Sequence, residues 1–459
     1  MYKPPNGRKI ECVNNQTFST IQQINNLIEF RQAVYQTGLG KSQDALFELL
    51  DALIERPHAD CAAEISLSPF FRRKWSSLYK AVEKGEVNEA ALSSLFMGQV
   101  PKTGVQVYPL DSTMWAHPAA RTLAGMVYGP SPTKALKRHS IVQGHEYSLL
   151  GWTAASRQSW TPTISTKRVE PDMGSIAVGV EQVQWLCQQR SVDEVTALDV
   201  IVADGHYGNH QFFSPLRQES CALLARLRRD RVLYGPPGAY KGRGRRPKHG
   251  QRFAFKQPET WGEPVDDVTF EQERWGQVRL RRWDNLHDKQ DADTILSVIC
   301  AEVHLEREKP PTPLWLGYKP GHTDYPVDEV WSWFDWRWPI EPSIRFRKQH
   351  LFWTLPALQE SEWCDRWTWL NQTAFWFLYL ARPLVADLYL PWQKPVVNLT
   401  PARVKRAYPT LFGVIGTPAA SPQTRGNASG WPKGKPRQQK ERHKPVKRRR
   451  FKPKKKQLI

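Results

Sequence analysis

The spacing of apolar residues changes near Gly104, and this change restricts the fold of the 459-residue chain more than any other feature. From about Thr17 to Met97, apolar side chains recur every three or four residues, which is the period of an amphipathic helix. Beyond Gly104, short apolar runs end in turn residues and alternate with helical segments. The order β-β-β-α-β-α-β predicts an α/β protein with a mixed sheet, preceded by an all-helical N-terminal domain in residues 1–100.

The remainder of the chain divides by composition. We expect the α/β domain to occupy residues 101–229 and 324–400, with its second part helical. Between these parts, residues 230–323 contain a Gly- and Arg-rich loop and several strand-like runs, which predict a β-rich insertion. Residues 401–459 lose the apolar periodicity and become rich in Pro, Lys and Arg, so we expect a disordered basic tail.

The positive charge of the chain is concentrated in this tail. The whole sequence has 65 Lys and Arg against 45 Asp and Glu, a net charge of +20. Residues 425–459 hold fifteen Lys or Arg and one acid, a net charge of +14. A cationic segment of this kind predicts a polyanionic partner, as in ribosomal, RNA-binding and DNA-binding proteins. Charge therefore indicates a class of partner and no chemistry.

Cysteine spacing and apolar segments favour a cytoplasmic protein. The six cysteines lie far apart without a Cys-x-x-Cys pair, so their spacing predicts neither a zinc site nor a disulfide framework. The N-terminal sequence lacks the apolar core of a signal peptide. The most apolar stretch, residues 374–381, is too short to cross a bilayer. We expect reduced thiols and no membrane contact.

Three acidic residues stand where a two-metal site would need them. Asp111 ends the strand-like run YPLDST, and Asp204 ends the run VIVADGHYGN. If these strands are parallel neighbours, both carboxylates project from one edge of the sheet, and Glu341 closes the site from a facing helix. Carboxylate oxygens suit Mg²⁺ or Mn²⁺. Taken singly, an aspartate at a strand end is more often a turn or cap residue than a metal ligand, and a lone glutamate on a helix is usually solvated.

Cations surround the glutamate at helical spacing. On one continuous helix, Phe334, Arg337, Glu341, Arg345 and Lys348 would share a single stripe. In a metal site that binds DNA phosphate, the acid holds the ion and the three cations take phosphate oxygens. The alternative is a basic helix with one stabilising ion pair.

This spacing resembles a signature of bacterial insertion-sequence transposases of the DDE type, whose RNase H-like catalytic domain is interrupted by a β insertion. Arg337, Glu341 and Lys348 match the signature Tyr-x₂-Arg-x₃-Glu-x₆-Lys at its intervals. Phe334 stands where that signature has tyrosine, so the phosphate hydrogen bond of a tyrosine hydroxyl is missing.

The segments around both aspartates resemble the other motifs of these transposases. The interval of 137 residues from Asp204 to Glu341 leaves room for the insertion between them. The resemblance covers about residues 105–352 and includes three motifs in the family's order. It implies that Asp111, Asp204 and Glu341 hold two Mg²⁺ or Mn²⁺ ions, which activate water or a DNA 3′-hydroxyl for in-line attack.

The resemblance also implies partners and a location. DNA is the partner, as terminal inverted repeats and as target, and a homodimer binds it in the bacterial cytoplasm beside the nucleoid. No small-molecule substrate is implied. Two alternatives stay open: a metal-dependent nuclease that cuts without joining, and a catalytically silent nucleic-acid-binding descendant of a transposase.

Two further groups are candidates for DNA contact. The segment GRGRRPKHG resembles Arg-Gly-Arg-Pro hooks that enter AT-rich minor grooves, which singles out Arg243, Arg245 and Arg246. Its alternative is a solvated loop. Trp315 and Trp338 are candidates for stacking on bases, although most aromatic residues at helical spacing pack in a core.

Overall fold

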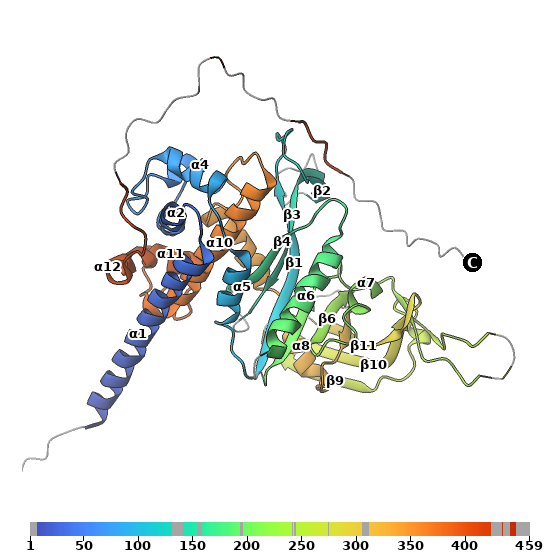
Figure 1. The fold of residues 1–459 in the computed structure, drawn as a ribbon. Helices are drawn as coiled ribbons and strands as arrows, with labels where there is room; N and C mark the ends of the chain where they lie inside the picture. The colour runs from blue at the N-terminus through green and yellow to red at the C-terminus, as the bar shows by residue number, and fades with distance from the viewer. Residues whose placement is uncertain are drawn as a thin grey trace, which may run out of the picture.

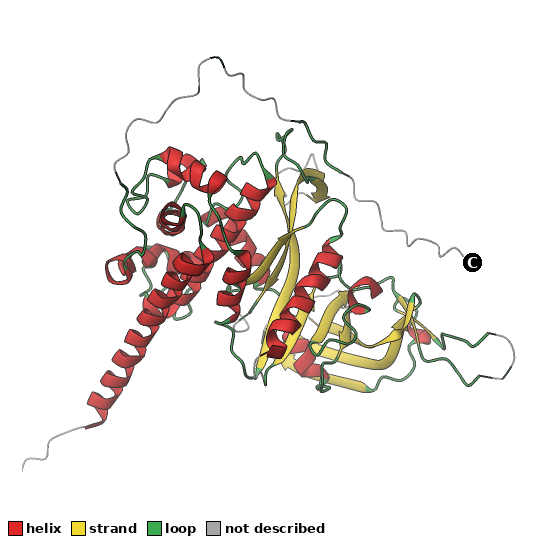
Figure 2. Cartoon of the chain, viewed as in Figure 1, coloured by secondary structure: helices red, strands yellow, loops and turns green. Residues whose placement is uncertain are grey.

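The structure, a computed structural model, describes residues 7–130, 141–153, 158–192, 196–240, 242, 245–273, 275–304, 312–423, 434 and 441–446. A bundle of helices from both ends of the chain lies beside a long sheet that carries helices of its own (Figures 1 and 2). Within the described residues, no helix is long and apolar enough to cross a membrane.

The helical bundle is built around α2 (Gln43–Glu55). Ten consecutive residues of α2 are buried, because other helices surround it, including α10 (Ser361–Ala381). The buried Arg31 guanidinium joins the two ends of the chain, since it donates to Asp51 Oδ1 at 2.6 Å and to Tyr408 Oη at 3.2 Å. The other N-terminal elements are α1 (Gly7–Ala33), the π-helical turn Val34–Gly38, α3 (Ala62–Ile65), α4 (Trp75–Lys84) and α5 (Glu89–Met97).

This bundle differs from the predicted division of the chain. The helices of residues 1–100 share one hydrophobic core with α10 and with α11 (Pro401–Ala407). The boundary predicted at 401 is too early, because α11 leads into the 3₁₀ turn Tyr408–Leu411 and α12 (Phe412–Ile415), which are buried in that core. These elements are too short to give a periodic pattern, and their burial depends on helices far away in the sequence.

Little of the remaining tail belongs to the described residues. Residues 424–433, 435–440 and 447–459 lie outside them. The described segment 441–446 lies beside β2, where the Val446 amide donates to the carbonyl of Met126 at 3.1 Å.

The strands of the described chain form one sheet of twelve, in the order β2-β3-β1-β5-β6-β12-β11-β10-β7-β8, with β4 beside β3 and β9 beside β10. Strand β1 is parallel to β5, and β5 is parallel to β6. Strands β3 and β12 run antiparallel at either side of this parallel centre. The strands are β1 (Val105–Ala116), β2 (Val127–Pro130), β3 (Ile141–Gly151), β4 (Thr163–Arg168), β5 (Leu198–Ala203), β6 (Ala222–Leu227), β7 (Val232–Tyr234), β8 (Arg252–Ala254), β9 (Asp266–Gln272), β10 (Gly276–Asp288), β11 (Asp291–His304) and β12 (Leu314–Lys319).

The two faces of the sheet belong to different cores. Successive side chains of a strand point to opposite faces. Tyr108 of β1 therefore joins the larger core with α6 (Ser175–Val192), whereas its neighbour Val107 joins a smaller core with α8 (Val327–Asp335). Sheet, flanking helices and added strands confirm the predicted mixed α/β fold, RNase H-like with a β-rich insertion.

The predicted insertion, residues 230–323, continues the same sheet. Strand β12 pairs with β6 on one side and with β11 on the other, and β10 extends the sheet further. These added strands continue the sheet beyond β6, at the lower right of Figure 1. Short elements complete the described chain: α7 (His210–Phe213) and the 3₁₀ turns Pro258–Thr260 and Arg382–Leu384.

The helix predicted through Phe334 and Lys348 is interrupted. Helix α8 ends at Asp335, and α9 (Ile340–His350) begins five residues later. Pro339 explains the break, because proline lacks an amide hydrogen and disfavours helical conformation in the residue before it. The expectation of one continuous helical stripe is therefore wrong, and the intervening turn has its own part in the site.

Candidate active site

Asp111 and Asp204 lie side by side at one edge of the parallel centre. The paired register of β1 and β5 ends with Leu110 opposite Ala203, so Asp111 and Asp204 occupy the next position after each of these residues. Asp111 is four residues beyond Val107, which places it on the face covered by α8. The strands are parallel neighbours, which is the condition on which the sequence argument for this site depended. Asp111 does not end its strand as expected, because β1 continues to Ala116 in its pairing with β3.

A tight turn holds the second aspartate. Oδ1 of Asp204 accepts a hydrogen bond from the backbone amide of His206 at 2.9 Å. The ring of His206 is held in turn, with Nε2 2.9 Å from the hydroxyl of Ser175 at the start of α6. The carboxylate is thus fixed by its own turn, and the histidine contributes to that turn.

Arg337 links the first and third acids from the turn between α8 and α9. Its Nη1 atom lies 3.6 Å from Oδ2 of Asp111, and its Nη2 atom lies 3.2 Å from Oε1 of Glu341. Glu341 is in the first turn of α9. Asp111, Asp204 and Glu341, three acids from distant parts of the chain, therefore line one cleft.

The carboxylates act on one another electrostatically. Burial raises the pKa of Asp111 to about 6; the Arg337 guanidinium opposes this rise, and the carboxylates of Asp204 and Glu341 add to it. Three carboxylates gathered in one cleft are a donor set for hard divalent cations. The residues present fit Mg²⁺ or Mn²⁺.

A row of cations that the sequence analysis does not single out lines the same cleft as the acids. The cleft has a volume of about 1710 Å³, and its lining includes Arg226, Arg228, Arg229 and Lys256. In the parallel pairing of β5 and β6, Ala203 is opposite Ala225. Arg226, the next residue of β6, is therefore beside Asp204, the next residue after β5. The alternating run RLRR directly after an apolar strand is the signal that could have found these arginines.

A family model described as DDE superfamily endonuclease matches residues 35–288, more than half of the chain. This chain belongs to the DDE superfamily endonucleases. Asp111 and Asp204 lie within the matched residues, and Glu341 lies beyond them. A comparison with curated proteins found no match. Membership indicates nuclease activity on DNA with divalent metal ions, which is a coarser statement than transposition.

In this DDE endonuclease, two of the predicted phosphate-binding cations lie apart from the cleft. Arg345 is exposed on α9, and Lys348 is largely buried at the far end of the same helix. The Lys348 ammonium donates to Thr113 Oγ1 at 2.7 Å and to the carbonyl of Met114 at 2.8 Å. Neither cation is among the described residues that line the cleft. Lys348 thus fixes α9 against β1.

The two predicted stacking tryptophans differ in exposure. Trp338, in the turn before α9, lines the cleft and is 45% exposed. Trp315 of β12 is only 2% exposed, and its ring stacks on Phe255 with 4.2 Å between centroids. Trp315 is therefore packed in the core, which was its alternative interpretation, although it also contributes to the lining of the cleft, and Trp338 is exposed there.

The predicted minor-groove hook is only partly described. Arg245 and Arg246 are exposed in the loop between β7 and β8, and the guanidinium of Arg246 lies 5.3 Å from the ring of Tyr240. Arg243 lies outside the described residues.

Proposed function

We propose that this DDE endonuclease is a transposase, which cuts DNA at the ends of its element and joins the freed 3′ ends to target DNA. Asp111, Asp204 and Glu341 are its catalytic triad and its metal ligands. The observation that carries the proposal is the convergence of these acids on one cleft, where Arg337 contacts two of them. Acids alone would be compatible with many metal enzymes, whereas acids that share a cleft with a row of arginines favour a phosphodiester substrate.

The protein's own groups hold and orient the DNA. Two divalent cations, when bound, supply an activated water or 3′-hydroxyl and neutralise the leaving oxygen. Asp111 and Asp204 are held rigidly by neighbouring strands, and Glu341 is held by a helix that Lys348 fixes to β1. The guanidinium of Arg337 has the planar donor geometry that binds two phosphate oxygens at once.

The DNA path follows from the positions of the cations and the exposed tryptophan. Arg226, Arg228 and Arg229 are placed to contact backbone phosphates along the cleft, and Trp338 to contact a base at its edge. We assign phosphate contact outside the cleft to Arg345, minor-groove contact to the loop that carries Arg243, Arg245 and Arg246, and DNA binding without base readout to the basic tail. Pairing of two terminal inverted repeats calls for a homodimer on DNA, in the bacterial cytoplasm.

The test is a cleavage and joining reaction on the inverted repeats that flank the reading frame. Asp111→Asn, Asp204→Asn and Glu341→Gln should each slow Mg²⁺-dependent cleavage by at least about a thousandfold while DNA binding is retained, because each removes a metal ligand. The matched control is Asp230→Asn: this acid lines the same cleft, is 62% exposed, and should be dispensable.

Pre-cleaved ends separate the transposase from its alternatives. Joining to target DNA supports the proposal. Cleavage without joining would identify a nuclease, and DNA binding without cleavage by the unaltered chain would identify a catalytically silent protein.

A further inference from the structure

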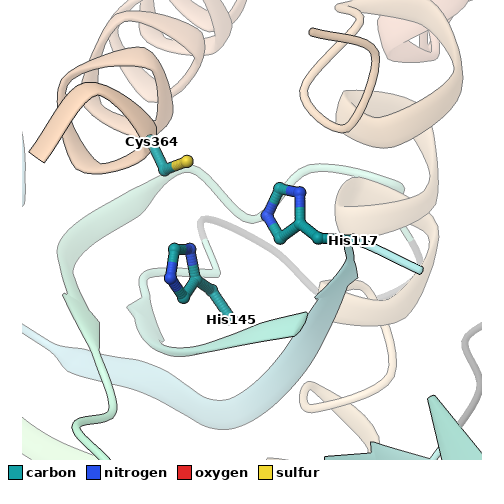
Figure 3. Close-up of side chains that lie close together, drawn as sticks. All are labelled: His117, His145 and Cys364. Atoms are coloured by element: carbon teal, nitrogen blue, oxygen red, sulfur yellow. The ribbon is translucent and has the colours of Figure 1, made fainter. Parts of the chain in front are cut away.

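A second group of metal-binding side chains lies beyond the end of β1. His117 follows β1, His145 belongs to β3, and Cys364 lies in the first turn of α10. One ligand atom of each residue lies within 4.8 Å of the others. All three side chains are buried, with exposed fractions of 7% for His117 and 0% for both others. Figure 3 shows the two rings and the thiol turned toward the same space.

Two ring nitrogens of this cluster have no hydrogen-bond partner among the described residues, Nε2 of His117 and Nδ1 of His145. Buried polar atoms are rarely left in this state, and such cases point to an absent ion or water. The other nitrogen of His145, Nε2, lies 2.8 Å from the carbonyl oxygen of Ala124, so Nε2 carries the hydrogen and Nδ1 carries the lone pair. A carbonyl that holds the far nitrogen is the usual support of a metal-bound imidazole.

The electrostatic environment keeps both rings in the form that binds metals. Burial, assisted by His145, lowers the pKa of His117 to about 3. Burial lowers the pKa of His145 to about 4, although the hydrogen bond to Ala124 acts in the opposite direction. Both imidazoles are therefore neutral at pH 7. Burial raises the pKa of the Cys364 thiol, so without a metal this residue keeps its proton.

We propose that His117, His145 and Cys364 bind one zinc ion. Nitrogen and sulfur donors are those that zinc selects, in contrast to the carboxylates of the active site. Bonds of about 2.0–2.3 Å place the donors of a tetrahedral site roughly 3.5 Å apart, so movements of about 1 Å close the cluster. On binding, an S–Zn bond replaces the S–H bond of Cys364, and the proton leaves to solvent.

This zinc site is distinct from the active site, and its three protein donors leave the fourth position of a tetrahedral ion to a water. We assign it the role of joining two parts of the fold. In the register of β1 and β3, Asp111 lies opposite Leu149 and Trp115 lies opposite His145, so the cluster is four residues away, about 13 Å along the strands. Its ligands come from the sheet and from α10, the helix that packs against α2 in the bundle. The ion would connect the helical bundle to the catalytic sheet.

The first experiment is metal analysis with cobalt as a spectroscopic probe. The full chain should contain one zinc per molecule, and Co²⁺ in its place should give the charge-transfer absorption of a cobalt–thiolate bond. Asp111→Asn should keep both signals, because the carboxylate site is separate. Cys364→Ala should lose both, whereas Cys300→Ala, which removes another buried thiol, should keep them. Zinc retained equally by both cysteine variants, or no thiolate band in the unaltered chain, would overturn the proposal.

A second measurement covers the case in which Cys364→Ala does not fold. The unfolding temperature of the unaltered chain should fall by several degrees when a chelator removes zinc in excess Mg²⁺, and it should recover when zinc returns. His117→Gln should show a lower unfolding temperature that zinc does not raise. An unfolding temperature of the unaltered chain that does not change when zinc is removed or returned would also overturn the proposal.

Discussion

Strand β1 carries two side-chain clusters of opposite chemistry, and the contrast shows how burial selects ligands. Asp111, in its second half, lies in an open cleft beside two further acids and a row of arginines. His117, just beyond its end, lies in a closed core beside an imidazole and a thiol. A site where metal ions bind phosphate must be wide and open to water, and it must carry negative charge to hold the metal ions. The cleft provides the space, and the carboxylates provide the charge. A site that joins layers needs donors that are neutral when the metal is absent, because buried charge is costly.

Arg337 contacts only the acids of the open cluster. Its replacement should therefore change the active site without changing the zinc site. Arg337→Ala should slow cleavage by about a hundredfold, because a bidentate phosphate contact is lost. The Mn²⁺ concentration needed for half-maximal rate should stay the same or fall, because the guanidinium that contacts Asp111 and Glu341 no longer competes with the cation. Zinc content should not change.

The matched control is Arg345→Ala, which removes an exposed cation of α9 outside the cleft and should cost a few-fold at most. A larger Mn²⁺ requirement in Arg337→Ala, or equal losses in the two variants, would contradict the assigned role.

Acid pH should weaken cation binding at the open cluster. The pKa of Asp111 is raised to about 6, so below that value a proton must leave before a cation binds. Apparent Mn²⁺ affinity, measured by calorimetry without DNA, should fall about tenfold per pH unit below 6 and level off above about 7. The imidazoles of the closed cluster, with pKa values of about 3 and 4, stay neutral in this range. A flat profile, or the same slope in Asp111→Asn, would show that another group is responsible.

Lys348 tests whether the two ends of β1 are independent, because its ammonium binds Thr113 and Met114 between them. Lys348→Met should lower the free energy of unfolding by about 1–3 kcal/mol, since buried acceptors lose their donor. It should slow cleavage about fivefold, because Glu341 is held less firmly. Zinc content should persist.

The neighbouring exposed residue provides the comparison, since Gln349→Met should change neither stability nor rate. Loss of zinc in Lys348→Met would show that the two clusters are coupled.

The open cluster could be predicted because its signals are local. Asp111 and Asp204 each end an apolar run, and parallel strands bring such ends together. The spacing of Arg337 and Glu341 places them close together even though Pro339 interrupts the helix. The buried position of Lys348 had no local signal, because burial depends on where α9 lies against β1.

The closed cluster could not be predicted from the sequence. His117 and His145 meet because β1 and β3 pair, and Cys364 joins them only because α10 lies over that edge. A zinc motif is recognised from cysteines and histidines that lie near one another in the sequence. These three ligands are far apart in the sequence, so no such motif was found. In the same way, the shared core of α2, α10 and α11 depends on contacts between the two ends of the chain, which periodicity does not report.

Asp111, Asp204 and Glu341 should form a single metal site, and metal-directed cleavage of the protein backbone shows whether they do. Fe²⁺ bound in place of Mg²⁺ generates radicals, in ascorbate and peroxide, that cut the nearby backbone. If they do, cuts appear beside all three acids, are suppressed together by excess Mg²⁺, and are lost together in Glu341→Gln. Cuts near the aspartates that persist unchanged in Glu341→Gln, or no cut near residue 341, would contradict it.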